Sequence, residues 1–118
     1  MKISDLKKCN TRRFGGDTMT STYGVNHYLM TQDDKLADTM TPVFFGGDAD
    51  RLNTGDHIRI ESEDRSIFFV LQVVTANKAT RQAETRILQI GEFCRDEVLK
   101  AEKEADKIWK SVDQRKAA

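Results

Sequence analysis

The stretch HIRIESEDRSIFFVLQVV, residues 57–74, predicts two neighbouring β-strands joined by a short turn. In its first part Ile58 and Ile60 alternate with polar residues, which is the period-two pattern of a half-buried strand. Residues 66–74 form a continuous apolar run rich in β-branched and aromatic side chains, and the polar EDRS sequence before them predicts the turn. Because such a run favours burial on both faces, we expect it to be the central strand of a sheet.

Three further segments have the composition of short strands. They are VNHYLMT (25–31), TPVFFG (41–46) and ETRILQI (84–90). About five short strands joined by tight turns within one small domain predict an antiparallel barrel or a rolled sheet. The side chains expected in its core are Ile58, Ile60, Phe68, Val70, Leu71, Val73, Ile87 and Ile90.

The acidic sequence GGDADRLNTGD, residues 46–56, connects two of these segments. It lacks the ligand spacing of a calcium loop, and its glycines do not open a helix as those of a phosphate loop do. We therefore predict structural turns here. Gly46 and Gly47 would allow positive φ after the aromatic doublet. Gly55 would take a left-handed position in a second turn, which the side chain of Asp56 would cap.

Residues 92–118 predict an amphipathic helix, since good helix formers dominate the segment. Its apolar residues, starting at Cys94, recur at spacings of four, three, four, three and four, which form a heptad seam. The seam could pack on its own domain, or on a partner helix or a second copy of the chain, and the sequence leaves both open. The candidate partner-binding residues are Val98, Ala101, Ala105, Ile108 and Val112 in the seam and Trp109 beside it.

Residues 1–22 are polar and carry five basic against two acidic side chains. They hold too little apolar surface to order themselves, so they predict an extended basic arm. Its candidate partner-binding residues are Arg12, Arg13 and Phe14, which come nearest to a basic patch with an aromatic residue. Residues 23–91 carry 7 basic and 10 acidic side chains, so nucleic acid is not expected to bind except through the arm.

At 118 residues the chain has the length of one domain. The expected fold class is α+β, with an extended basic arm at 1–22, a small antiparallel β-barrel-like domain at 23–91 and an amphipathic helix at 92–118. The formal net charge is zero, so no overall field attracts nucleic acid. No apolar run has transmembrane length and no signal peptide is evident, so we expect no membrane partner.

No pattern of reactive or metal-binding residues predicts an enzyme. Cys9 and Cys94 form no Cys-x-x-Cys motif and are expected to be free thiols in a reducing compartment. His27 and His57 have no second ligand at a usable spacing, and no nucleophile motif is present. We therefore predict no catalytic residue, no metal and no cofactor.

The sequence DDKLADTMTPVFFGGDADRLNTGDHIRI, residues 33–60, resembles a pattern in small structural-module proteins of tailed bacteriophages. In that pattern an Asp-x-Leu-Ala stretch leads to an aromatic doublet, then a Leu, then Gly-Asp-x-Ile into a strand. The matching residues are Asp34, Leu36, Ala37, Phe44, Phe45, Leu52, Gly55, Asp56 and Ile58. The resemblance covers about residues 26–74, and FFGGDAD stands where a Phe-Asn-Asp-type turn is more usual.

This resemblance implies a non-enzymatic virion or virion-associated protein, assembled in the host cytoplasm. Its expected partners are other virion proteins, namely capsid, portal or tail subunits. The heptad seam adds a second copy of the chain, bound through the helix, as a further possible partner. A capsid accessory or decoration protein is the first expectation, and a head–tail junction or tail accessory protein the next. An arm, a domain and a helix would combine several modest contacts. The alternative is a small barrel adaptor or a nucleic-acid-binding regulator.

Overall fold

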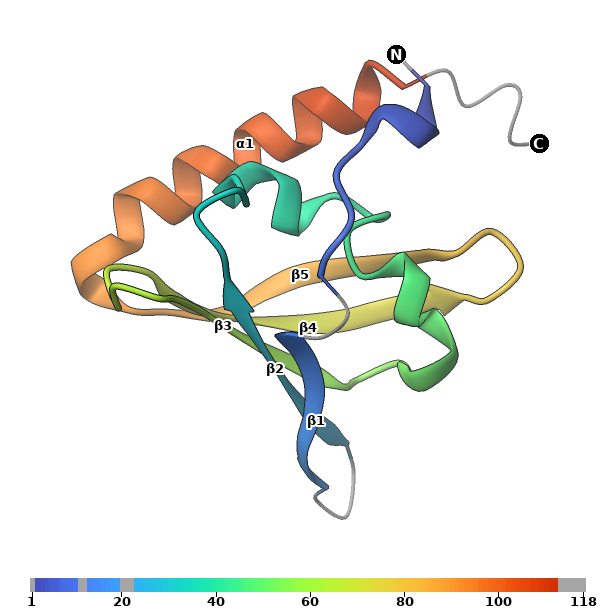
Figure 1. The fold of residues 1–118 in the computed structure, drawn as a ribbon, viewed down its shortest axis with the longest axis horizontal. Coiled ribbons are helices and arrows are strands. Elements are labelled where there is room, and N and C mark those ends of the chain that lie inside the picture. Colours follow the sequence, from blue (N-terminus) through green and yellow to red (C-terminus); the bar gives the residue numbers. More distant parts are fainter. Residues whose placement is uncertain (1, 11–12, 20–22, 113–118) are drawn as a thin grey trace.

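The computed structural model describes residues 2–10, 13–19 and 23–112, with residues 16–19 described as backbone alone. Its strands are β1 (Phe14–Met19), β2 (Gly24–Met30), β3 (His57–Ser62), β4 (Phe68–Asn77) and β5 (Gln82–Ile90). Its α-helix is α1 (Arg95–Lys110), and its 3₁₀ helices are η1 (Ile3–Asp5), η3 (Leu36–Met40), η4 (Gly46–Arg51) and η5 (Glu92–Cys94). The predicted α+β class is confirmed (Figure 1).

The strands form one open sheet in the order β1-β2-β3-β4-β5, so β1 and β5 are its edges. Strands β2 and β3 are parallel, and the other neighbours are antiparallel. The expectation of a purely antiparallel sheet is therefore wrong, and the sheet that the described residues form is open, not closed into a barrel. The reason is the connection from β2 to β3, residues 31–56, because a parallel pair needs a long crossover rather than a hairpin.

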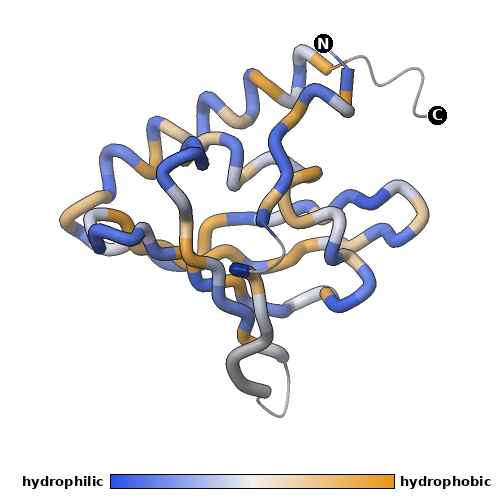
Figure 2. The backbone as a smooth tube through the Cα atoms, viewed as in Figure 1, coloured by the Kyte–Doolittle hydropathy of each residue, from blue (hydrophilic) through white to orange (hydrophobic). Residues whose placement is uncertain are grey.

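One face of the sheet, here called the inner face, packs against the crossover and α1. Its core contains Ile58, Ile60, Leu71 and Val73 of the predicted core list, which confirms burial for these four. Val70 is also buried, although alternation along β4 places it on the opposite face. Phe68, Ile87 and Ile90 are only half-buried. In Figure 2, hydrophobic residues line much of the strands and polar residues line the loops.

The sequence TPVFFG is a turn that leads into η4, so its predicted strand is wrong. Phe44 and Phe45 are both buried, and their rings meet edge to face with centroids 4.9 Å apart. Successive residues of a strand point to opposite faces, whereas a helical turn can direct two successive rings into one core. Both rings also pack on Tyr28 of β2, which fixes the crossover above the inner face.

The apolar run of residues 66–74 contributes to β4, which lies one position from the edge, while β3 is the middle strand. The prediction that this run is the central, doubly covered strand is therefore wrong. Phe69 is fully buried in the inner core, but Phe68 is half-buried on the opposite face. An interior strand next to an uncovered face can carry apolar side chains there, because its neighbours shield them in part.

The extended arm predicted for residues 1–22 is also corrected. Residues 14–19 form β1 and pair with β2. Phe14 is 3% exposed, and its ring lies 4.9 Å from that of Phe45. Before β1, the Cys9 N–H donates to Phe44 O at 2.9 Å, and Leu6 is buried beside α1. A few apolar anchors thus order a segment whose average composition is polar.

Candidate functional site

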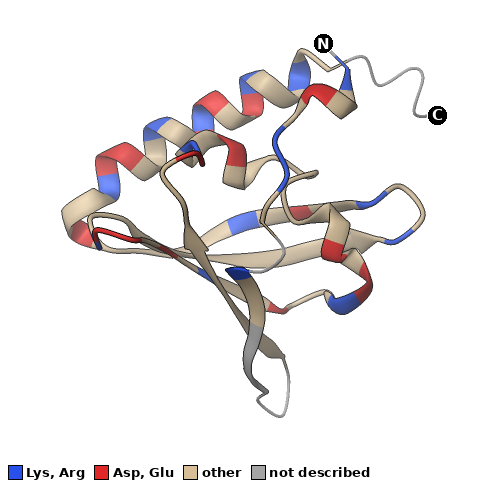
Figure 3. Ribbon diagram, viewed as in Figure 1, with Lys and Arg blue, Asp and Glu red and all other residues tan. Residues whose placement is uncertain are grey.

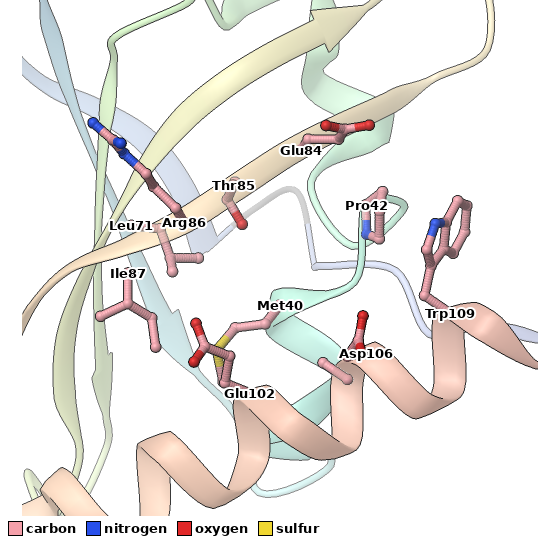
Figure 4. A pocket seen from close by; sticks show the side chains of 11 residues that line it. Met40, Pro42, Leu71, Glu84, Thr85, Arg86, Ile87, Glu102, Asp106 and Trp109 are labelled. Atoms are coloured by element: carbon pink, nitrogen blue, oxygen red, sulfur yellow. The ribbon is translucent and has the colours of Figure 1, made fainter.

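The free edge of β5 lies beside α1, and a groove of about 280 Å³ separates them (Figure 4). Met40 of η3, Pro42 and Leu71 of β4 contribute apolar lining. Helix α1 follows β5 directly through η5 and then runs back across the inner face, so it leaves this edge partly uncovered. The remaining lining residues are Glu84, Thr85, Arg86, Ile87, Glu102, Ala105, Asp106 and Trp109.

The carboxylates of Glu102 and Asp106 point from α1 toward the strand (Figure 4). Asp106 also forms an i,i+4 ion pair with Lys110, at 2.8 Å. Arg86 points to the other side of β5, where its Nε donates to Gln72 Oε1 at 2.8 Å. The α1 wall of the groove is therefore acidic, although Lys and Arg alternate with Asp and Glu along the helix as a whole (Figure 3).

The heptad seam of α1 is buried within the chain, so of the two arrangements that the sequence left open, the structure has the seam packed on its own domain. Val98 joins the main core, and Val112 packs with Leu6 and Val43. Ala101 and Ala105 pack on Ala37 of η3. These small residues let α1 approach η3 closely, which explains why an alanine-rich seam has no need of a second helix.

Ile108 and Trp109 are half-buried and pack against the cluster of Leu6, Val43 and Val112. Trp109 lines the groove together with Pro42 (Figure 4). Of the predicted partner-binding residues on the helix, Ala105 and Trp109 line the groove, and Trp109 is the less buried of the two.

Of the predicted partner-binding residues of the arm, the two that the structure describes, Arg13 and Phe14, make contacts within the chain. Arg13 donates from Nε to Leu29 O at 2.9 Å and forms an ion pair with Glu63 at 2.8 Å. Phe14 lies in the core. Arg12 lies outside the described residues, and nothing places it at a site.

The acidic connection of residues 46–56 forms structural turns, as predicted, but not through every glycine named. Gly55 has a φ of 94°, which confirms its left-handed position. Asp56 is buried and accepts from Asn53 N at 3.0 Å, which confirms the cap, and also from Gly24 N at 2.9 Å.

Gly46 and Gly47 lie in η4 without positive φ, so that part of the turn prediction is wrong. Glycine is required at position 46 because another part of the backbone lies too close for a side chain. A Cβ on Gly46 would lie 1.8 Å from Arg81 O, whereas one on Gly47 would meet no atom within 4 Å.

A cluster of titratable groups joins the N-terminal segment to the crossover. Tyr28 donates from its hydroxyl to Asp34 at 2.6 Å, and Cys9 Sγ lies 3.6 Å from Asp48 Oδ2. Burial, reinforced by Asp48, raises the pKa of the Cys9 thiol from 9.0 to about 12. Burial and the bond to Asp34 raise the pKa of Tyr28 as well. Both groups are therefore held protonated, which suits a structural contact rather than nucleophilic chemistry.

Within the described part of the chain, no three His, Cys, Asp or Glu side chains gather as a metal site would require. His27 and His57 lie apart from any such group, on the outer face of the sheet. None of the described helices has both the length and the apolar character needed to cross a membrane.

The outer face of the sheet, opposite α1, carries aromatic and basic side chains on neighbouring strands. Tyr23 stacks on His57 with ring centroids 3.9 Å apart. The Arg59 guanidinium lies 5.7 Å from the ring centre of Phe68. Alternation in β3 puts His57 and Arg59 on this face, because Ile58 and Ile60 fill the inner core.

The chain matches no protein-family model, no curated protein and no solved structure. Sequence reasoning missed the groove, because its two walls come from separate elements. One signal was present: Glu102 and Asp106 are four residues apart, which places two carboxylates on the same side of a helix.

Proposed function

We propose that this protein is a non-enzymatic structural component of a tailed-phage virion that binds other virion proteins. The resemblance of residues 33–60 to phage structural modules supports this class. A capsid accessory or decoration protein is the first proposal, and a head–tail junction or tail accessory protein the second.

The observation that carries the binding role is the free edge of β5 beside an acidic groove. An exposed strand edge offers backbone hydrogen-bonding groups to another chain, and such edges are usually shortened, covered or charged. The groove presents strand backbone, two helix carboxylates and one tryptophan, which form a protein-binding surface. Cys9 and Tyr28 do not line the groove, and both are held protonated, which favours a non-enzymatic role.

Mass spectrometry of purified particles tests this proposal. The protein should be enriched in particles relative to the host lysate and should stay bound through a density gradient. Particles assembled without the protein should then distinguish its two proposed positions in the virion. Loss of capsid stability indicates a decoration protein, and unjoined heads and tails indicate a junction protein. Absence from purified particles, with abundant protein in the lysate, would contradict the virion role.

The outer face of the sheet favours one second candidate, a nucleic-acid-binding regulator. Stacked aromatic rings next to Arg59 offer the combination that binds single-stranded nucleic acid. Glu61 and Glu63 lie near this surface, and their negative charges oppose the binding of nucleic acid there. Fluorescence anisotropy with labelled single-stranded DNA and RNA, across a salt series, tests this candidate. Salt-sensitive binding that Arg59→Ala weakens would support it, and no binding at low salt would exclude it.

A further inference from the structure

The backbone of β5 leaves hydrogen-bonding groups unused at its middle. Val73 of β4 donates its N–H to Asp56 O and accepts from Gly55 N, both at 2.8 Å, so both its groups point away from β5. Thr85 is the β5 partner of Val73. Its own N–H and C=O therefore point away from β4, toward the free edge, because the groups of one strand residue share a direction.

One end of this segment is defined by a hydrogen bond and the other by a shift of register. Ala83, two residues before Thr85, donates its N–H to Pro42 O at 2.7 Å, which occupies the edge there. Ile87, two residues after, shares the outward direction of Thr85. Beyond it the register with β4 shifts between Ile87 and Gln89. The open edge therefore comprises Thr85 and Ile87, with room for a few residues of a pairing strand.

The side chains on the inner side of an added strand would face α1. There the carboxylates of Glu102 and Asp106 point toward β5 (Figure 4). Met40 and Pro42 line the same groove and supply apolar surface beside these acids. A lysine or arginine fits this combination, because its methylene stem can cover apolar surface while its charge reaches the carboxylates.

We propose that the groove between β5 and α1 binds an extended, basic segment of a partner protein by strand addition. The segment pairs its backbone with Thr85 and Ile87 and directs alternate Lys or Arg side chains at Glu102 and Asp106. Main-chain hydrogen bonds give affinity in this mode, and the facing side chains give specificity. The proposal rests on the proposed function, in that the partner is another virion protein.

Charge distinguishes this occupant from a second copy of the chain. Two copies paired through β5 would bring their α1 helices together, each with Glu102 and Asp106 directed at the shared edge. Like charges in one desolvated groove oppose that arrangement, whereas a basic segment is attracted to it.

Fluorescence anisotropy on the purified full chain tests the proposal, with a labelled hexapeptide of alternating Lys and Val as the probe. The same peptide with Glu in place of Lys should bind at least about tenfold more weakly. In two further probes the backbone amide nitrogens are methylated, either at every Val or at every Lys. One version should lose binding and the other keep it, because only alternate N–H groups of an added strand face β5.

Variants of the protein test the two walls separately. Thr85→Pro removes an outward N–H that β4 does not use, so proline is tolerated there, and binding should weaken about tenfold. Thr85→Val keeps the N–H and should bind normally. Glu102→Gln should weaken binding about threefold, whereas Glu104→Gln, the same change on another side of α1, should not.

Equal binding of the Lys and Glu peptides, or equal loss with both methylated versions, would overturn the proposal. Wild-type affinity in both Thr85→Pro and Glu102→Gln would also overturn it. If the chain dimerises and Thr85→Pro abolishes the dimer, the edge is assigned to a second copy. Glu102→Gln changes an exposed side chain, so its result holds even if the proline variant unfolds. Failure here with the protein present in particles rejects the groove alone; binding here with the protein absent from particles rejects the virion role alone.

Discussion

The two faces of the sheet differ in what covers them. The inner face is closed by the crossover, the N-terminal segment and α1, and its aromatic cluster is almost fully buried. The outer face has no such cover among the described residues, and its side chains pair with one another, as Arg59 does with Phe68 and Arg86 with Gln72. Stability should therefore depend on the inner face, while the outer face and the β5 edge are free for contacts.

Removal of residues 95–118 should have the largest effect. The deletion exposes the inner-face surface that Val98, Ala101 and Ala105 cover, and loses Val112 with them. The lost burial should cost more than about 5 kcal/mol, which is the whole stability of many small domains. Circular dichroism and urea titration should show an unfolded chain. A cooperative β-sheet transition in the truncated protein would mean that α1 is an appendage after all.

Phe69→Ala and Phe68→Ala compare the faces at successive positions. Phe69 is 0% exposed in the inner core, so its truncation should cost about 3–5 kcal/mol. Phe68 is half-buried on the outer face, so its truncation should cost about 1–2 kcal/mol. Chemical denaturation of both variants measures the difference. Equal losses would show that the outer face is covered as well as the inner one.

Gly46→Ala and Gly47→Ala compare a contact inside the fold with one on its surface. The added methyl at position 46 would meet the Arg81 carbonyl, so the β4–β5 hairpin must shift, at a cost of about 1–3 kcal/mol or more. At position 47 the methyl has open space, and stability should stay within about 0.5 kcal/mol of the wild type. Thermal melting distinguishes them. Identical melting temperatures for the two variants would show that Gly46 does not lie against the Arg81 carbonyl.

Asp56→Ala should lower the free energy of unfolding by about 1–3 kcal/mol, because the backbone amides of Asn53 and Gly24 lose the buried carboxylate that accepts their hydrogen bonds. Asp50→Ala, on the exposed side of η4, is the matched control and should be nearly neutral. Denaturation midpoints with and without calcium check both the size and the cause. A calcium-dependent stabilisation that Asp50→Ala abolishes would restore the metal-loop interpretation of this segment.

The smallest effect is expected at Asp64, an exposed carboxylate in the β3–β4 turn. Hydrogen bonds from Ser66 and Ser62 lower the pKa of Asp64 from 3.8 to about 2. Because the folded pKa lies below the unfolded one, this turn adds stability above pH 3.8 and loses it as pH falls toward 2. Carbon-13 NMR titration should give that midpoint, and Ser66→Ala should move it upward. A wild-type midpoint near 3.8 would show that the turn is open.

The sequence alone identified four strands and the helix correctly in type. Alternation in residues 57–62, the apolar run after it and the helix formers from residue 92 are local patterns with direct structural causes. The cap by Asp56 and the left-handed Gly55 were also predictable, since a turn is decided within a few residues.

Only the tertiary structure decided how these elements are used. Residues 14–19 became a strand because Phe14 reaches the ring cluster of Phe44, Phe45 and Tyr28, which comes from distant parts of the chain. The parallel pairing of β2 and β3 turned an expected barrel into an open sheet. The seam of α1 fits a partner helix or η3 equally well by sequence, and only the folded chain shows that η3 occupies it. The groove follows from the same cause: Thr85 and Glu102 face one another only after α1 folds back across the sheet, and no local pattern encodes a contact of that kind.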